Sequence, residues 1–288
     1  MLLWAVLVGL SFPAVRVMSE LPPFSLTSLR FFIACGGLWW LARRSPFFLP
    51  RWRQLPLYSL MGLCLAGFFG AMFWAAHHAT ALSMATLFVT VPLLAFLLGL
   101  GFGVERLAWR LPAILALGAT GALGLAFAES VGQAGRLQFG IGEAVFFLGC
   151  VSTALYPVLS KWGLATGRLP ASAAVRTFWS LGLGAVLIGL LGLAVEPVAG
   201  LASMTGRDLW LLLFLGLLST ALTFWLLQRA TAVLTPGAVT AYSYLVPFVS
   251  MLLLFVREPE RIGWVWLPGS LLVIVAIALL LSNGRAAG

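Results

Sequence analysis

Long apolar runs follow one another along the whole chain, separated by short polar links. Each run covers about 17 to 22 residues, enough for a helix to cross a hydrocarbon core of about 30 Å. Residues 271–281 are apolar on every side, which excludes the alternating pattern of a membrane barrel. The pattern predicts ten transmembrane helices, at residues 2–18, 25–42, 55–76, 81–103, 109–127, 141–160, 172–194, 208–227, 236–256 and 264–282.

Composition agrees with an all-α polytopic membrane protein, because 62% of the residues are hydrophobic and only 9% are charged. The first run starts almost at Met1 and has no basic n-region, so we expect a retained helix and not a signal peptide. Cys35, Cys64 and Cys150 lie inside apolar runs without paired spacing. We interpret them as small core residues and predict neither a metal site nor a disulfide.

Basic residues gather in the links after the even-numbered spans and in the C-terminal tail. The first of these links alone carries Arg43, Arg44, Arg51 and Arg53. The positive-inside rule then places both termini in the cytoplasm, and we expect an integral protein of a bacterial cytoplasmic (inner) membrane. The net charge of +9 predicts attraction to anionic membrane lipids, and no nucleic-acid partner is expected because the arginines are spread over loops.

The two halves of the chain resemble each other. Residues 73–81 (FWAAHHATA) share Phe-Trp and Ala-Thr-Ala with residues 224–232 (FWLLQRATA). Residues 91–106 and 246–261 both start with Val-Pro and end with Glu-Arg. Chance similarity among apolar helices is the alternative explanation.

A repeat of five spans inverts the topology of its second copy, because five is an odd number. We therefore predict two inverted five-helix repeats, at residues 1–137 and 138–288. Many secondary transporters are built from inverted repeats, which open a midplane site to each side in turn.

The repeated unit resembles the EamA-type unit of the drug/metabolite transporter superfamily. The resemblance rests on Arg30-Phe31 in the second span and on a Pro92 span that ends in Glu105-Arg106. Within the superfamily, the length and the aromatic-rich early helices look most like the YddG-type amino-acid exporters. The resemblance implies ten helices, a central cavity lined mainly by helices 1, 3, 4, 6, 8 and 9, and export of metabolites. Residues 82–92 are three residues shorter than their counterpart at 234–247, a departure from the pattern near the fourth helix.

Candidate cavity residues combine aromatic rings, hydroxyl groups and the two histidines, which suit binding of an amphiphilic solute. Packing, interfacial belts and bonds to a residue's own helix are the alternatives for each of them. The candidates are Ser11, Trp74, His77, His78, Thr86, Thr90, Tyr156, Trp179, Trp225, Tyr242, Ser243 and Tyr244.

Four prolines, Pro13, Pro92, Pro157 and Pro247, fall inside predicted spans and are candidates for kinks or gating hinges, although membrane helices also tolerate proline without such a role. Arg30 and Arg176 occupy corresponding positions inside the second and seventh spans. An unpaired cation is costly there, so we predict a structural clamp on loop carbonyls or headgroups.

None of the eight acidic residues falls at the middle of a predicted span. Ion-coupled carriers usually keep such a group in the pathway, so the sequence favours export of small organic metabolites by facilitated diffusion. Amino acids, including aromatic ones, fit better than sugar phosphates. A proton-coupled drug/metabolite exporter using His77 or His78 is the first alternative. A channel or an intramembrane lipid-processing enzyme is the second.

The chain has no phosphate-binding loop, and no residues arranged for nucleophilic or metal-assisted catalysis are evident. We therefore expect a transporter that is not an enzyme. No cofactor and no metal are predicted, and a monomer is compatible with the sequence.

Overall fold

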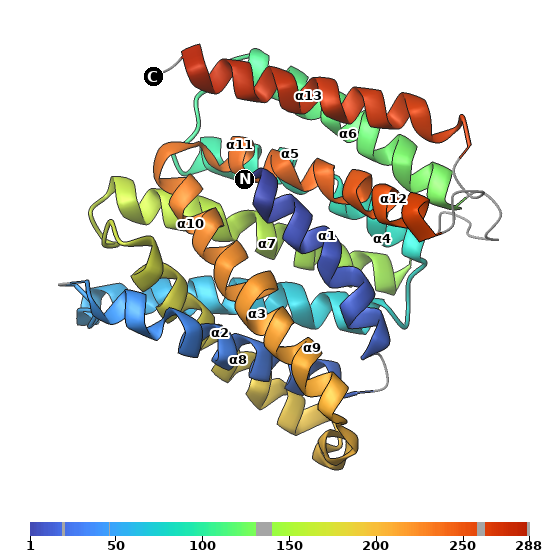
Figure 1. The fold of residues 1–288 in the computed structure, drawn as a ribbon. Coiled ribbons are helices and arrows are strands. Elements are labelled where there is room, and N and C mark those ends of the chain that lie inside the picture. The colour runs from blue at the N-terminus through green and yellow to red at the C-terminus, as the bar shows by residue number, and fades with distance from the viewer. Residues whose placement is uncertain (19–20, 46, 131–139, 258–262, 287–288) are drawn as a thin grey trace.

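The structure is a computed structural model that describes residues 1–288 except 19–20, 46, 131–139, 258–262 and 287–288. Ten helical spans lie within the described residues, as the sequence predicts, and they form one bundle of roughly side-by-side helices (Figure 1). Seven of them are α1 (Leu2–Val17), α2 (Pro23–Arg43), α3 (Leu55–Ala75), α6 (Arg110–Ser130), α7 (Ile141–Ala165), α8 (Ala173–Val195) and α13 (Trp266–Ala286).

The other three spans are interrupted helices. The fourth span consists of α4 (Ala81–Phe88) and α5 (Val91–Gly101). The eighth span consists of α9 (Gly206–Gly216), the π-helical η3 (Leu217–Leu222) and α10 (Thr223–Val233). The ninth span consists of α11 (Pro236–Ala241), the 3₁₀ turn η4 (Tyr242–Tyr244) and α12 (Leu245–Arg257). Two further 3₁₀ turns, η1 (Trp52–Gln54) and η2 (Val198–Ser203), lie in the links before α3 and α9.

Eight of the described spans are long and apolar enough to cross a membrane, and α1 and α13 supply shorter apolar stretches. The chain is an integral membrane protein. Two predicted span ends fall five or six residues short of the observed helices, because α7 continues to Ala165 and α10 continues to Val233. Helical structure persists there beyond the apolar run, since Lys161 and Arg229 can extend their charged groups away from the hydrocarbon while the backbone stays helical.

Helix-interior prolines account for where two spans break. Proline has no N–H to donate to the carbonyl four residues earlier, so it suits the first turn of a helix. Pro92 lies in the first turn of α5, immediately after the break at residues 89–90. Pro247 is the third residue of α12 and follows the 3₁₀ turn η4.

Glycines allow the closest helix crossings. A Cβ atom on Gly62 of α3 would come within 2.8 Å of the Gly184 backbone nitrogen in α8. A Cβ atom on Gly121 of α6 would come within 2.9 Å of the Gly269 carbonyl oxygen in α13. In the absence of a hydrophobic force between helices in lipid, such close backbone packing is what holds the spans together.

Candidate functional site

Three of the predicted cavity residues lie together at one end of α3. The imidazole of His78 stacks on the Trp74 indole with ring centroids 3.9 Å apart, and its Nδ1 lies 2.8 Å from the Trp74 carbonyl oxygen. His77 and His78 are both exposed in the link that follows. This pair therefore sits in a link between spans and not within one.

Two predicted cavity tryptophans lie toward the opposite end of the bundle. Trp179, near the start of α8, donates its indole N–H to the Phe48 carbonyl at 2.7 Å. The guanidinium of Arg229 lies 5.4 Å from the centre of the Trp225 ring in α10. Both rings are half-buried and pack against one cluster of side chains at this end. Trp74 and Trp225 occupy matching places in the predicted repeat, but they lie at opposite ends of the bundle.

The tyrosines of the candidate set are buried in two different cores. Tyr242 and Tyr244 of η4 pack with α6 and α13, where Gly118 makes room for the Tyr244 ring. Tyr156 of α7 packs instead in the core around α2, α3 and α8. Ser243 is buried beside the η4 tyrosines. The tyrosine rings therefore serve as core contacts in this conformation.

The remaining hydroxyl candidates bond within their own span or lie partly exposed. Ser11 donates to the Val8 carbonyl and Thr90 to the Leu87 carbonyl, both at 2.6 Å. Thr86 is half-buried on α4. The predicted cavity residues are thus dispersed along the bundle, and the central chamber that the resemblance implies stays a prediction.

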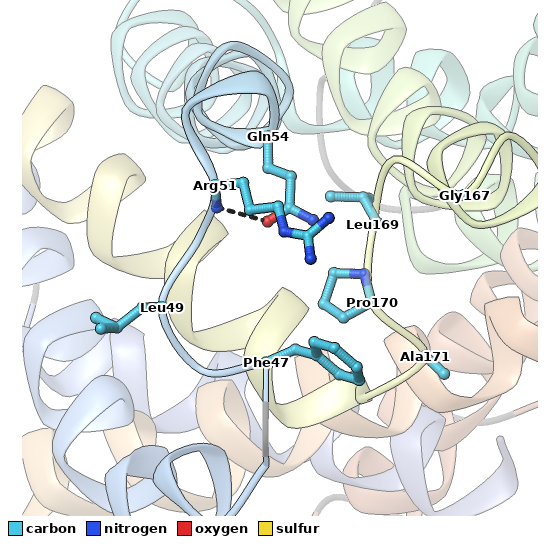
Figure 2. A pocket seen from close by; sticks show the side chains of 8 residues that line it. All are labelled: Phe47, Leu49, Arg51, Gln54, Gly167, Leu169, Pro170 and Ala171. Carbon is cyan, nitrogen blue, oxygen red and sulfur yellow. Dashed lines mark hydrogen bonds between the residues drawn. The ribbon is translucent and has the colours of Figure 1, made fainter.

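Two pockets within the described residues lie elsewhere. One, of about 210 Å³, lies between the α2–α3 and α7–α8 links, where Arg51 extends its guanidinium toward Pro170 (Figure 2). The other, of about 340 Å³, is an apolar groove between α2 and η3 that includes Trp225. Trp225 is the one candidate cavity residue that either pocket includes.

The four hinge prolines differ in their surroundings. Pro92 and Pro247 follow breaks, as described above, whereas α7 runs without interruption through Pro157. Pro13 falls within α1, and its side chain lies outside the described residues. Gating by any of them stays a prediction.

Arg176 is the centre of a buried polar network. Its side chain has no exposed surface. The guanidinium donates to the carbonyl oxygens of Pro170 at 2.7 Å, Ala171 at 2.8 Å and Gln228 at 2.6 Å, and Nε donates to Gln228 Oε1 at 3.0 Å. The guanidinium therefore contacts loop carbonyls, as in the predicted clamp, and it also ties α8 to α10.

More polar side chains from α3, α7 and α8 complete this network. Ser160 donates to Gln228 Oε1, and the Tyr156 hydroxyl lies 2.9 Å from Ser180 Oγ. The Tyr58 hydroxyl and Gln228 Nε2 are buried without a hydrogen-bond partner among the described residues. Sequence reasoning missed this cluster, although a glutamine at the end of an apolar run was a signal that could have found it.

Arg30 has a different environment from its counterpart. Its guanidinium donates to Thr220 Oγ1, to Ser219 Oγ at 3.1 Å and to the Ser219 carbonyl at 3.3 Å, all within η3. The prediction of a clamp on loop carbonyls or headgroups is wrong for this residue, because the π-helical turn offers a carbonyl and two hydroxyls inside the bundle. Both arginines consequently donate to the same span, α9–η3–α10, so their hydrogen-bond partners do not follow the predicted repeat.

The comparisons with known proteins agree with this architecture. Residues 140–282 match the model of the EamA-like transporter family. The chain belongs to this family. The matched residues run from the start of α7 into α13, the second of the two predicted five-helix units, and the family lies within the drug/metabolite transporter superfamily that the sequence resembles.

A relative and a solved structure cover nearly the whole chain. A protein of Streptantibioticus cattleyicolor, named a probable terminal-alkyne amino-acid exporter, is 29% identical over 289 residues, which is 96% of this chain and 90% of that protein. A crystal structure superposes with a TM-score of 0.77 at 22% identity, over 99% of this chain and 97% of its own. The second similarity shows a shared fold.

Proposed function

We propose that this chain exports small zwitterionic organic solutes, above all amino acids and including aromatic ones, by alternating access between two inverted halves. The halves are residues 1–137 and 138–288, and the solute path lies between them. The observation that carries the proposal is the pair of broken spans, α4–α5 and α11–α12, in a chain of the EamA-like family.

The broken spans support the alternating-access part of the proposal. Each is the fourth span of its half, each is interrupted after its first helix, and each resumes beside a proline, Pro92 or Pro247. Discontinuous helices at matching places in two inverted repeats are the usual location of a transporter's solute site. The short first segments, α4 and α11, can tilt at their breaks while α5 and α12 stay packed.

The distribution of acids supports facilitated diffusion. In the part of the chain that the structure describes, Glu105 and Glu196 lie in links or at a helix cap, and Glu129, Glu143 and Asp208 lie in the first or last turn of a helix. A proton- or sodium-coupled carrier usually needs a carboxylate that both sides can reach. None of these five is placed in that way.

The choice of amino acids as substrate rests on a relative and on side-chain chemistry. The Streptantibioticus relative is named a probable terminal-alkyne amino-acid exporter. Spans that carry aromatic rings and, among the described residues, no carboxylate near their middle suit a zwitterion with an apolar side chain better than a strongly anionic solute.

The test is counterflow in proteoliposomes. Vesicles containing the purified protein and loaded with an unlabelled amino acid such as phenylalanine are expected to take up the labelled form transiently, saturably and without any ion gradient. A panel of amino acids added outside should compete. Flux that does not saturate would indicate a channel, and accumulation that requires an imposed pH gradient would indicate proton coupling.

Trp74 and Trp109 provide a matched pair of variants for this assay. Trp74 lies at the end of α3 and Trp109 in the link before α6, and both are exposed in this conformation. Trp74→Ala is expected to lower saturable flux several-fold if its ring contacts the solute. Trp109→Ala should leave it unchanged, and equal loss in both variants would argue against a solute contact at Trp74.

A further inference from the structure

Glu105 is a buried carboxylate in the link between α5 and α6. Its side chain is only 7% exposed, and Oε1 accepts a hydrogen bond from the backbone N–H of Gly237 in the first turn of α11 at 2.9 Å. The Thr235 hydroxyl, just before α11, also donates to it. Glu105 of the first half thereby holds the start of the broken span of the second half.

Glycines on two helices make room for this carboxylate. A Cβ atom on Gly237 would lie 2.8 Å from Glu105 Oε1, and one on Gly99 of α5 would lie 3.1 Å from Glu105 Cγ. A real Cβ is essentially never found within 3.0 Å of another heavy atom, so a larger residue at Gly237 would displace the carboxylate and would also press on the Phe96 Cβ, 3.1 Å away.

The surrounding charges also favour this position. Lys161 of α7 attracts the carboxylate electrostatically, and its ammonium donates to the Ala232 carbonyl at the end of α10 at 3.1 Å. Other cations near this end are Arg106 on the same link, Arg110 at the start of α6, and Arg229 of α10, which faces Trp225. The contact therefore joins the α5–α6 link, α7, and the α10–α11 link.

A matching contact exists at the other end of the bundle. Glu143, in the first turn of α7 and 4% exposed, accepts a hydrogen bond from the Gly140 backbone N–H at the start of its own helix at 2.9 Å, and the Thr80 backbone N–H and the Ser83 hydroxyl at the start of α4 also donate to it. The α3–α4 link lies close against α7 here, since a Cβ on Gly142 would fall 2.3 Å from the His78 carbonyl oxygen. Glu143 belongs to the second half and holds the broken span of the first. The starts of α4 and α11 lie at opposite ends (Figure 1).

We propose that Glu105 and Glu143 are reciprocal latches, each fixing the short first segment of the other half's broken span, and that release of Glu105 frees α11 and opens that end of the path. That release of Glu105 opens a path for a solute rests on the proposed function. The contacts span the two halves, which is where a rocking motion must break and remake interactions. Each latch acts on a segment that has a break on its far side.

The test measures accessibility at Val239, a fully buried residue of α11. A Val239→Cys reporter, in a background where Cys35, Cys64 and Cys150 are replaced by Ala, is labelled with a membrane-impermeant maleimide in inside-out vesicles. Glu105→Ala is expected to raise the labelling rate about tenfold, as for loss of a charge-assisted hydrogen bond. Glu105→Gln, which can still accept from Gly237, should stay close to the parent.

Glu196→Ala is the matched control for the carboxylate. Glu196, at the end of α8, accepts from the backbone N–H groups of Phe24 and Ser25 at 2.7 and 2.9 Å, a contact of the same kind on the unbroken helix α2. The Glu196→Ala variant should leave the labelling rate of Val239→Cys unchanged. Unchanged labelling in Glu105→Ala, or an equal rise in Glu196→Ala, would overturn the latch.

A second variant disturbs the contact between Glu105 and Gly237 without removing the carboxylate. Gly237→Ala should displace the carboxylate and raise labelling, whereas Gly101→Ala, whose Cβ would meet nothing within 4 Å, should not. If Glu105→Ala fails to fold, Gly237→Ala decides alone, and parental labelling in it refutes the proposal. The labelling needs no transported solute, so a failed counterflow experiment with a positive labelling result would reject the substrate and leave the latch standing.

Discussion

Replacing Arg176 by Ala should destabilise the protein strongly, because this cation has no exposed surface and all its contacts are internal. It donates four hydrogen bonds, three to carbonyl oxygens and one to Gln228 Oε1. A buried acceptor left without its donor costs about 1–3 kcal/mol, so the loss of several at once should cost about 3–5 kcal/mol after local rearrangement. Arg176→Lys should recover only part of this, since a single ammonium cannot reach acceptors in both the α7–α8 link and α10.

The assay is thermal unfolding of the detergent-solubilised protein, followed by the monodisperse fraction that remains after heating. A loss of about 3–5 kcal/mol corresponds to a fall in Tm of roughly 6–20 °C for a chain of this size. Arg53→Gln, an exposed cation in the α2–α3 link, is the control and should change Tm little. If Arg176→Ala melts with the parent, the network does not hold α8 to α10 and the reasoning fails.

Three other outcomes follow from the geometry. Gly121→Leu should lower Tm by several degrees, because even a Cβ there lies 2.8 Å from Leu272 Cβ, whereas Gly36→Ala meets nothing within 4 Å and should not. Burial raises the pKa of the Glu105 carboxyl, so the latched form binds a proton more tightly than a released, hydrated form. Acidification slows maleimide labelling of every cysteine because the thiolate reacts, and labelling of Val239→Cys should slow more steeply with Glu105 present than in Glu105→Gln, where only the pH dependence of the thiol is left. Arg30→Ala should remove the hydrogen bonds that Arg30 gives to Ser219 and Thr220 and lower Tm less than Arg176→Ala, because Arg30 is only half-buried.

Sequence reasoning predicted the spans well because hydropathy and length decide them. In lipid, a run of this length must be helical, because only then are its backbone N–H and C=O groups satisfied within the segment. Of the four prolines named as candidate kinks, Pro92 and Pro247 lie just after breaks, whereas α7 continues through Pro157. Sequence reasoning did not predict the π-helical turn at 217–222. That turn contains the acceptors of Arg30, which lies 189 and 190 residues away from Ser219 and Thr220 and approaches only through tertiary packing.

The candidate site was harder to predict, because hydropathy does not say which way a span faces. Tyr244 and Trp225 lie on spans expected to line a cavity, yet Tyr244 packs against Gly118 and Trp225 lies beside Arg229. From the sequence, Glu105 is recognisable only as a motif residue at a span end. Its partner Gly237 is 132 residues away, so the chain alone gave no sign of the contact.

The central claim is that two five-span units lie in the membrane with opposite orientation, and single-cysteine labelling tests it most directly. Leu107, 69% exposed in the link after α5, and Trp264, 87% exposed just before α13, occupy corresponding links of the two halves. With an impermeant maleimide added to intact cells, Trp264→Cys should react and Leu107→Cys should react only after the membrane is opened. Reaction of both from the same side would contradict the inverted arrangement and the alternating-access mechanism built on it.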